Sequence, residues 1–211
     1  MKVKATLSDR VEGCLLGAAI GAEQEIRLKD GRTARARRVR SSDTELFLGF
    51  FDGLSAQSRD FMHGWSTNCD REHARKYAES LAAKADSADH CALVVMTPDP
   101  SKENIIGYCW LDRLSSSDLP PMLGIGAIDA FHGMGLGRIM LRIMIDHAKR
   151  MGFDRVELGV FDDNLRAFHL YESVGFHRDP AFPPKDFAGR TEVYLIVETG
   201  RGAAPNDRGG K

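Results

Sequence analysis

The chain has 211 residues, and its 29 Lys and Arg against 30 Asp and Glu leave a formal net charge of −1 at pH 7. This balance gives no general attraction to nucleic acid or to an anionic membrane surface. The length suits one domain with a single core, and 43% hydrophobic with 28% charged residues are proportions of a soluble globular protein.

The first 22 residues are ambiguous. Apolar residues recur at helical spacing between Val11 and Ala19, but two glycines inside the run weaken a helix. The apolar stretch Gly13–Gly21 is too short to span a bilayer and lacks the basic region that opens a signal peptide. We therefore expect a separate N-terminal segment and no membrane association.

Two strand-like runs follow, joined by Asp30-Gly31, a dipeptide that favours a hairpin turn. The second run is rich in arginine, which suits an edge strand protected by charge, or contact with an acidic partner or a phosphate. Ser42 to Glu45 has the pattern of a capping box that opens a helix with an apolar face. Ser55 is expected to cap the next short helix.

The middle of the chain alternates helix and strand signals. We expect a helix at 70–85 and strands at 92–96, 105–114, 122–128, 155–160 and 193–197. The four cysteines, Cys14, Cys69, Cys91 and Cys109, lack disulfide or metal-ligand spacing. Cys91 and Cys109 fall in apolar strands, where a free cysteine acts as a small buried hydrophobe. This indicates reduced thiols in a cytoplasmic protein and no metal site.

Three glycines at alternate positions, Gly133, Gly135 and Gly137, lie between the strand at 122–128 and an apolar-periodic helix over Leu136–Met151. Glycine allows the positive φ angles that turn backbone N–H groups toward one point. The helix adds its own free N–H groups and the positive end of its dipole. The pattern therefore suits a phosphate or pyrophosphate site, although the same spacing also serves as a plain strand-to-helix turn.

A second motif follows the strand at 155–160 and runs from Asn164 through Ala167 and Tyr171 to Gly175-Phe176. Together with the glycine loop, it resembles the GNAT superfamily of acyl-CoA-dependent N-acyltransferases. That family's signature is [QRH]-G-x-G-x-[GA], a strand, and N-x-x-A-x-x-x-Y-x-x-x-G-F. His132 stands here where the family usually has Gln or Arg. The resemblance covers roughly residues 25–198 and is looser before Cys91.

The resemblance implies an α/β (α+β) fold with a single domain over 23–199. The tail at 200–211 is rich in Gly and polar residues, so we expect it to be disordered. The domain's mixed, mostly antiparallel sheet would have about six or seven strands, splayed at the centre, with helices on both faces. The resemblance further implies that acetyl-CoA is held by the backbone and side chains of Gly126, Ala127, Ile128, His132, Gly133, Met134, Gly135, Leu136, Gly137, Arg138 and Asn164. Tyr171 would be the general acid that protonates the leaving thiolate. A core tyrosine is the alternative reading of Tyr171.

The general base is left open. Glu157, Asp112, Asp129 and Asp162 are candidates, although each also suits a surface carboxylate. Some family members that acetylate protein N-termini have a Glu where this chain has Gly159, which argues against that subclass. Candidate residues for the wall of the acceptor site are Phe50, Phe51, Arg59, Asp60, His63 and Trp65, each of which also suits a structural role.

The leading hypothesis is transfer of an acetyl group from acetyl-CoA to a primary amine, either of a small molecule or of a protein lysine. A catalytically silent acyl-CoA sensor of the same fold is the alternative. A dinucleotide-binding Rossmann domain is a third reading, but the loop lacks the G-x-G-x-x-G register. Nothing in the sequence indicates or excludes a homo-oligomer.

Overall fold

The computed structural model describes residues 23–62, 71–84, 90–99, 101–113, 119–187 and 189–200. The expectations for the N-terminal segment, for the tail after residue 200, and for Cys14, His63, Trp65 and Cys69 lie outside these described residues.

Within the described residues, nine strands form one sheet in the order β1-β2-β3-β4-β5-β6-β9-β7, with β8 also paired to β9. The strands are β1 Gln24–Arg27, β2 Thr33–Arg38, β3 His90–Met96, β4 Ile105–Asp112, β5 Met122–Ala127, β6 Arg155–Phe161, β7 His177–Arg178, β8 Lys185–Phe187 and β9 Arg190–Glu198. Among these described strands, only β5 and β6 pair in parallel. The mixed, mostly antiparallel sheet is confirmed, and a doubly wound parallel sheet of the Rossmann type is excluded.

The strand count differs from the expected six or seven because β7 and β8 were not anticipated. They have two and three residues, which is too short for an alternating apolar pattern to show in the sequence. The hairpin at Asp30-Gly31 is confirmed, since β1 and β2 pair in antiparallel register on either side of it.

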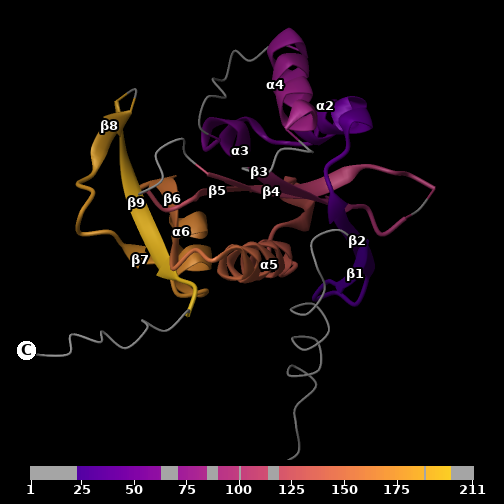
Figure 1. Cartoon of the computed structure of the whole chain (residues 1–211). Helices are drawn as coiled ribbons and strands as arrows, with labels where there is room; N and C mark the ends of the chain where they lie inside the picture. The colour runs from indigo at the N-terminus through magenta and orange to yellow at the C-terminus, as the bar shows by residue number, and fades with distance from the viewer. Residues whose placement is uncertain are drawn as a thin grey trace, which may run out of the picture.

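Helices cover both faces of the sheet, as expected (Figure 1). On one face lie α2 Thr44–Asp52, α3 Ala56–Asp60 and α4 Arg71–Ala83, and on the other lie α5 Leu136–Met151 and α6 Leu165–Glu172. Two short 3₁₀ turns, η1 Ser41–Asp43 and η2 Asp129–Phe131, precede α2 and the glycine loop. Ser55 caps α3, because its hydroxyl oxygen accepts the Ser58 N–H at 3.1 Å.

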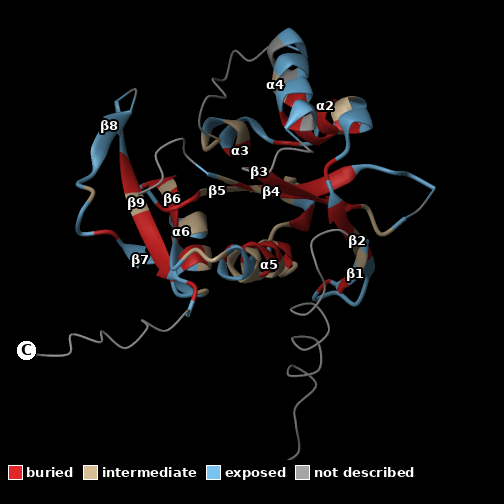
Figure 2. Cartoon of the chain, viewed as in Figure 1, coloured by how far each residue is buried: buried red, intermediate tan, exposed pale blue. Residues whose placement is uncertain are grey.

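The core has two parts, one on each face of the sheet, and β3 contributes to both. All seven residues of β3 are buried, and successive side chains of a strand point to opposite faces. Cys91, Leu93 and Val95 join the cluster beneath α5, whereas Ala92, Val94 and Met96 join the cluster beneath α2 and α4. Figure 2 shows this buried centre with exposed residues on the outer helix faces. Cys91 and Cys109 are buried free thiols, as expected.

The start of α2 is built differently from the expected capping box. Ser42 lies inside η1, and no side chain caps α2. Instead, the Asp43 carboxylate accepts the Arg40 N–H at 2.8 Å and two guanidinium N–H groups of Arg37 at 2.7 and 2.8 Å. The Ser42 cap was wrong because a charge-assisted bidentate pair is stronger than a neutral hydroxyl cap.

The arginine-rich strand β2 is not an edge strand, because β1 covers its outer side. Its charges have partners within the protein. Arg35 pairs with Glu23 and Glu103, and Arg37 pairs with Asp43. These arginines therefore hold the sheet to its flanking segments.

Asp43→Ala should lower the free energy of unfolding by about 3–5 kcal/mol, since it leaves the Arg37 guanidinium buried without its partner. Both side chains are almost inaccessible, with 6% and 2% of their areas exposed. Urea denaturation measures the change, with Glu72→Ala, which breaks an exposed ion pair with Lys76, as the control. A loss no larger than that of the control would show that the buried pair is not stabilising.

Candidate active site

The sheet opens at its centre, where β5 and β6 pair at a single position. Met122 lies opposite Glu157, and the Glu157 N–H donates to the Pro121 carbonyl at 3.1 Å. Beyond this point the two strands diverge, so the expected splay is present. A cavity of about 350 Å³, lined by residues of both strands, occupies it and extends to the glycine loop.

Strand alternation decides which backbone groups of β5 face this split. The Ile128 N–H donates to the Ile106 carbonyl of β4 at 3.0 Å, and Gly126 lies opposite Tyr108 in the same ladder. In an antiparallel pair, every second residue directs its N–H and C=O to the same neighbour. Ile128 and Gly126 therefore face β4, whereas Ala127 and Ile125 face the split. Ile125 was not among the residues that the sequence singled out.

The glycine loop adopts the geometry that its sequence suggests. Gly133 and Gly135 have φ angles of +76° and +83°, values that favour glycine. Gly137 has a different role, because it belongs to the first turn of α5, where an added Cβ would lie 2.7 Å from Leu170 of α6. Leu136, Gly137 and Arg138 thus begin α5, and their N–H groups have no acceptor one turn earlier in the helix.

Lys29 reaches the glycine loop from the β1–β2 hairpin. Its backbone N–H donates to the Met134 carbonyl at 3.0 Å, and its side-chain stem passes over Gly135, where an added Cβ would lie 3.3 Å from Lys29 Cγ. Lys29, Arg138 and Arg166 all line the 350 Å³ cavity. The N-terminal hairpin therefore brings a cation to the loop amides, a contact that the local pattern of the loop could not indicate.

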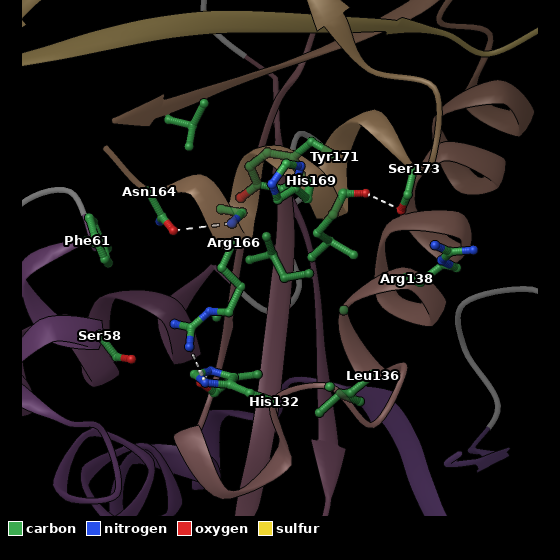
Figure 3. A pocket seen from close by; sticks show the side chains of 18 of the residues that line it. Ser58, Phe61, His132, Leu136, Arg138, Asn164, Arg166, His169, Tyr171 and Ser173 are labelled. Carbon is green, nitrogen blue, oxygen red and sulfur yellow. Dashed lines mark hydrogen bonds between the residues drawn. The ribbon is translucent and has the colours of Figure 1, made fainter. Parts of the chain in front are cut away.

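His132 connects β5 to α6 (Figure 3). Its Nε2 lies 3.0 Å from the Ala127 carbonyl oxygen, and its Nδ1 lies 2.7 Å from Arg166 Nη1. Because the guanidinium can only donate, Nδ1 accepts and Nε2 carries the proton that it donates to Ala127. Burial and the Arg166 charge lower the pKa of His132, in agreement with a neutral ring. His132 thus fixes the end of β5, and Arg166 is a further residue that the sequence analysis missed.

Asn164 and Tyr171 lie at the two ends of α6. Asn164 is its N-cap, since Oδ1 accepts the Ala167 N–H at 3.2 Å. Tyr171 is 8% exposed, and burial raises the pKa of its phenol. Both line the 350 Å³ cavity, together with Gly126, Ala127, His132 and the loop glycines. The structure therefore brings these predicted site residues together.

A second cavity, of about 370 Å³, lies across the sheet opening on the side of α3 and α4. Half of its lining residues are aromatic, namely Phe61, Tyr77, Tyr108, Trp110, Tyr171, Phe187 and Tyr194. Five residues line both cavities, namely Phe61, Met62, Ile125, Gly159 and Tyr171. The two cavities therefore meet at Tyr171 and the start of the β5–β6 split.

The expected acceptor wall is only partly right. Phe50 and Phe51 are 0% and 3% exposed and pack in the core, Phe50 against the Tyr108 ring. Asp60 instead forms an ion pair with Arg190, with 2.9 Å between Asp60 Oδ2 and Arg190 Nη1. Phe61 and Met62, which follow α3 directly, supply the cavity wall. The sequence analysis did not single them out, because apolar residues next to a short helix look the same whether they line a cavity or a core.

None of the four carboxylates considered as general bases lines either cavity within the described residues. Asp112 pairs with Lys84 at 2.9 Å. Asp129 accepts hydrogen bonds from the hydroxyls of Ser55 and Ser58, both at 2.8 Å, and from the Ser55 N–H at 3.0 Å. Burial alone would raise the pKa of Asp129, but these hydrogen bonds lower it to about 2. Asp129 therefore ties α3 to the turn before the glycine loop.

Within the described ranges, no group of three or more His, Cys, Asp or Glu side chains is placed to hold a metal ion. In the same part of the chain, no helix has the length and apolar character needed to cross a membrane.

Comparisons with known proteins agree with this geometry. A model described as acetyltransferase (GNAT) family matches residues 54–176. Over 88 residues the chain is 34% identical to a mycothiol acetyltransferase of Jonesia denitrificans, a match that covers 42% of this chain and 27% of that protein. Over 86 residues it is 30% identical to the spermine/spermidine N(1)-acetyltransferase of Bacillus subtilis, covering 40% of this chain and 49% of that protein.

Among solved structures, the GNAT domain of S. lividans PAT superposes with a TM-score of 0.67 at 18% identity, covering 83% of this chain and 96% of that domain. At this identity the likeness concerns the fold. The matches to the two curated relatives span 27% and 49% of their lengths.

Asp129→Asn should lower the free energy of unfolding at pH 7 by about 1 kcal/mol, the typical net value of a hydrogen bond. An unfolded aspartate has a pKa of about 3.9. Because folding lowers this pKa to about 2, the stabilisation is complete above pH ~4 and disappears as the pH falls through about 2. Urea denaturation from pH 7 to pH 2.5 should show the two proteins converging at the acid end. If the free energies of unfolding of the two proteins differed by the same amount across this pH range, the lowered pKa would not belong to Asp129.

Proposed function

This chain belongs to the acetyltransferase (GNAT) family, and on that premise we propose that it transfers the acetyl group of acetyl-CoA to a primary amine of a small molecule or a protein lysine. The observation that carries the proposal is the meeting of two cavities at one tyrosine. The 350 Å³ cavity has the loop amides and the cations, whereas the 370 Å³ cavity has aromatic walls. Two different substrates can therefore approach Tyr171 from opposite sides.

The first cavity fits the parts of acetyl-CoA in order. The start of α5, with Lys29 and Arg138 beside it, suits the pyrophosphate. The backbone groups of Ile125 and Ala127 that face the split suit the amide groups of the pantetheine arm, which would pair with β5 as an added strand does. When bound, acetyl-CoA supplies the thioester whose carbonyl is attacked.

The chain's own groups then have separate tasks. A β5 backbone N–H that faces the split can donate to the oxygen of the attacked carbonyl as negative charge develops there. Tyr171 keeps its proton at neutral pH, because burial raises the pKa of its phenol. It gives this proton to the sulfur as the C–S bond breaks, in a transfer coupled to that cleavage. Asn164 fixes the start of the helix that carries Tyr171.

One relative supports an amine acceptor, since it is named a spermine/spermidine N(1)-acetyltransferase. The buried free thiols Cys91 and Cys109 support the expected cytoplasmic location. A silent acyl-CoA sensor would keep the first cavity and would not need a proton donor at its junction with a second one. The shared position of Tyr171 therefore favours the enzyme.

Thermal denaturation with acetyl-CoA, CoA, ATP and NAD tests the cofactor. A ligand at 100 times its Kd adds about 2.7 kcal/mol and moves the melting temperature by several degrees. Acetyl-CoA and CoA should do so, and NAD should not. A thiol-release assay with spermidine, glucosamine and a lysine peptide then tests transfer. Binding of acetyl-CoA without turnover on any of these amines would favour the sensor.

Tyr171→Phe should lower turnover by about 10²-fold or more, in line with typical acid–base contributions. The Kd for acetyl-CoA should stay within a factor of about three, because the phenyl ring keeps the packing against Phe176. Thiol release measures the first quantity and calorimetry the second. Unchanged turnover would remove Tyr171 from the mechanism.

Lys29→Met should weaken acetyl-CoA binding by about 10-fold, the equivalent of one charge-assisted hydrogen bond. Methionine keeps the apolar stem over Gly135 and removes only the charge. Calorimetric titrations at two salt concentrations should also show a weaker salt dependence than in the wild type. Lys76→Met, on the exposed face of α4, is the matched control. Equal affinities in the two variants would show that Lys29 does not contact the ligand.

A further inference from the structure

We propose that Glu192 of β9 is the general base that takes a proton from the acceptor amine, and that the acceptor is a cationic amine. The inference rests on the proposed acetyl transfer and assigns the step for which the sequence analysis found no residue.

Glu192 is the only charged side chain on the wall of the 370 Å³ cavity within the described residues. It is 8% exposed, and the rest of the wall is aromatic or apolar. An ammonium group is attracted both to the faces of aromatic rings and to a carboxylate. A cavity with this lining therefore selects a positively charged amine and directs it to Glu192.

Tyr194 and Gly159 are among the neighbours that position the Glu192 carboxylate. The Tyr194 hydroxyl donates to Oε2 at 3.1 Å, and burial together with Glu192 raises the pKa of Tyr194 to about 12, so this donor keeps its proton. Oε1 occupies the space above Gly159, where an added Cβ would overlap it. Gly159 thus leaves room for the carboxylate at the residue where the two cavities join.

The base and the acid lie at different points of one continuous space. Glu192 lines only the 370 Å³ cavity, whereas Tyr171 lines both. An amine in the 370 Å³ cavity can therefore reach the carboxylate without entering the 350 Å³ cavity. The proton can therefore be removed on one side of the attacked carbonyl and supplied on the other.

The proton balance closes with these two residues. The carboxylate of Glu192 takes one proton from R–NH₃⁺, and the lone pair of R–NH₂ attacks the thioester carbonyl to form the C–N bond. When the C–S bond breaks, Tyr171 gives its proton to the sulfur. The nitrogen, still carrying two hydrogens, returns one to the phenolate. The products are the amide and CoA thiol, and Glu192 releases its proton to solvent.

Other titratable groups surround this carboxylate and bear on its pH dependence. On the same face lie Arg190 and Tyr194 of β9, Glu157 of β6 and Lys185, the cross-strand partner of Glu192 on β8. Asp179 is a further charge near Glu157. The pKa of Glu157 is raised mainly by burial and next by the negative charge of Asp179. Tyr77, Tyr108 and Tyr171 line the same cavity as Glu192. The tyrosines with raised pKa values, Tyr77, Tyr108, Tyr171 and Tyr194, stay neutral below pH 9.

Glu192→Gln tests the proposal through the pH dependence of kcat/KM, measured by thiol release with whichever of spermidine, glucosamine and the lysine peptide the wild type acetylates fastest. At pH 7 the variant should be slower by about 10²-fold or more. The deficit should shrink as the pH rises toward 9, because a growing fraction of an amine with a pKa of about 10.4 is then already neutral. A merely structural role would slow the reaction by the same factor at every pH.

Glu198→Gln is the matched control, since it makes the same substitution on the same face of β9 at a side chain that is 64% exposed; it should behave as the wild type. Tyr194→Phe, which removes only the hydroxyl that positions Glu192, should give a smaller deficit that also shrinks with pH. This variant serves as the test if Glu192→Gln does not fold.

The outcomes separate the two proposals. Wild-type turnover on none of the amines defeats the proposed function itself. Wild-type turnover with a Glu192→Gln deficit that is absent or independent of pH overturns only the assignment of Glu192. Calorimetry should show acetyl-CoA binding unchanged in Glu192→Gln, and a lost cofactor site would also overturn the assignment.

Discussion

The divergence of β5 from β6 is the constraint on which the rest of this structure depends. The two strands are neighbours at Met122 and Glu157 and then separate. The sheet nevertheless stays one body, because α5 packs beneath both strands and β4 and β9 hold their outer edges. The opening leaves the backbone N–H and C=O of Ile125 and the N–H of Ala127 directed into a cavity, whereas the Ala127 carbonyl already accepts from His132. Buried N–H and C=O groups need partners, so the opening suits a ligand that itself carries amides.

The chemical character changes from one side of this opening to the other. The glycine loop side carries positive charge and free helix amides, with Lys29 brought in from the first hairpin and Arg166 from α6. The opposite side is rich in aromatic residues and, among the residues that the structure describes, carries one carboxylate. In the proposed reaction, this difference would keep a polyanionic donor and a cationic acceptor on separate sides until they meet at Tyr171. His132 remains neutral between Ala127 and Arg166, so it holds the geometry without adding a charge.

Much of the fold was readable from the sequence because its signals are local. The helix over Leu136–Met151 was predicted with its observed bounds, since its apolar spacing and flanking glycines define both ends. The strands near residues 92, 105 and 122 show nearly continuous apolar runs, and the strand near residue 155 begins with alternating polar and apolar residues. The predicted Ser42 cap was wrong because Asp43 instead binds Arg37, a residue of the preceding strand β2. The two short strands β7 and β8 exist only through their pairing with β9.

The sequence by itself determined the family, the glycine loop and the positions of Asn164 and Tyr171, because each depends on spacing within one segment. Only the tertiary structure brought Lys29 to Gly135, directed Ile125 into the split and placed Glu192 above Gly159. The contact between Glu192 and Gly159 joins two neighbouring strands, β9 and β6, and its position depends on the register of the whole β6–β9 ladder. A side chain's distance along the chain does not tell which cavity it enters, because strand order, register and alternation together decide that.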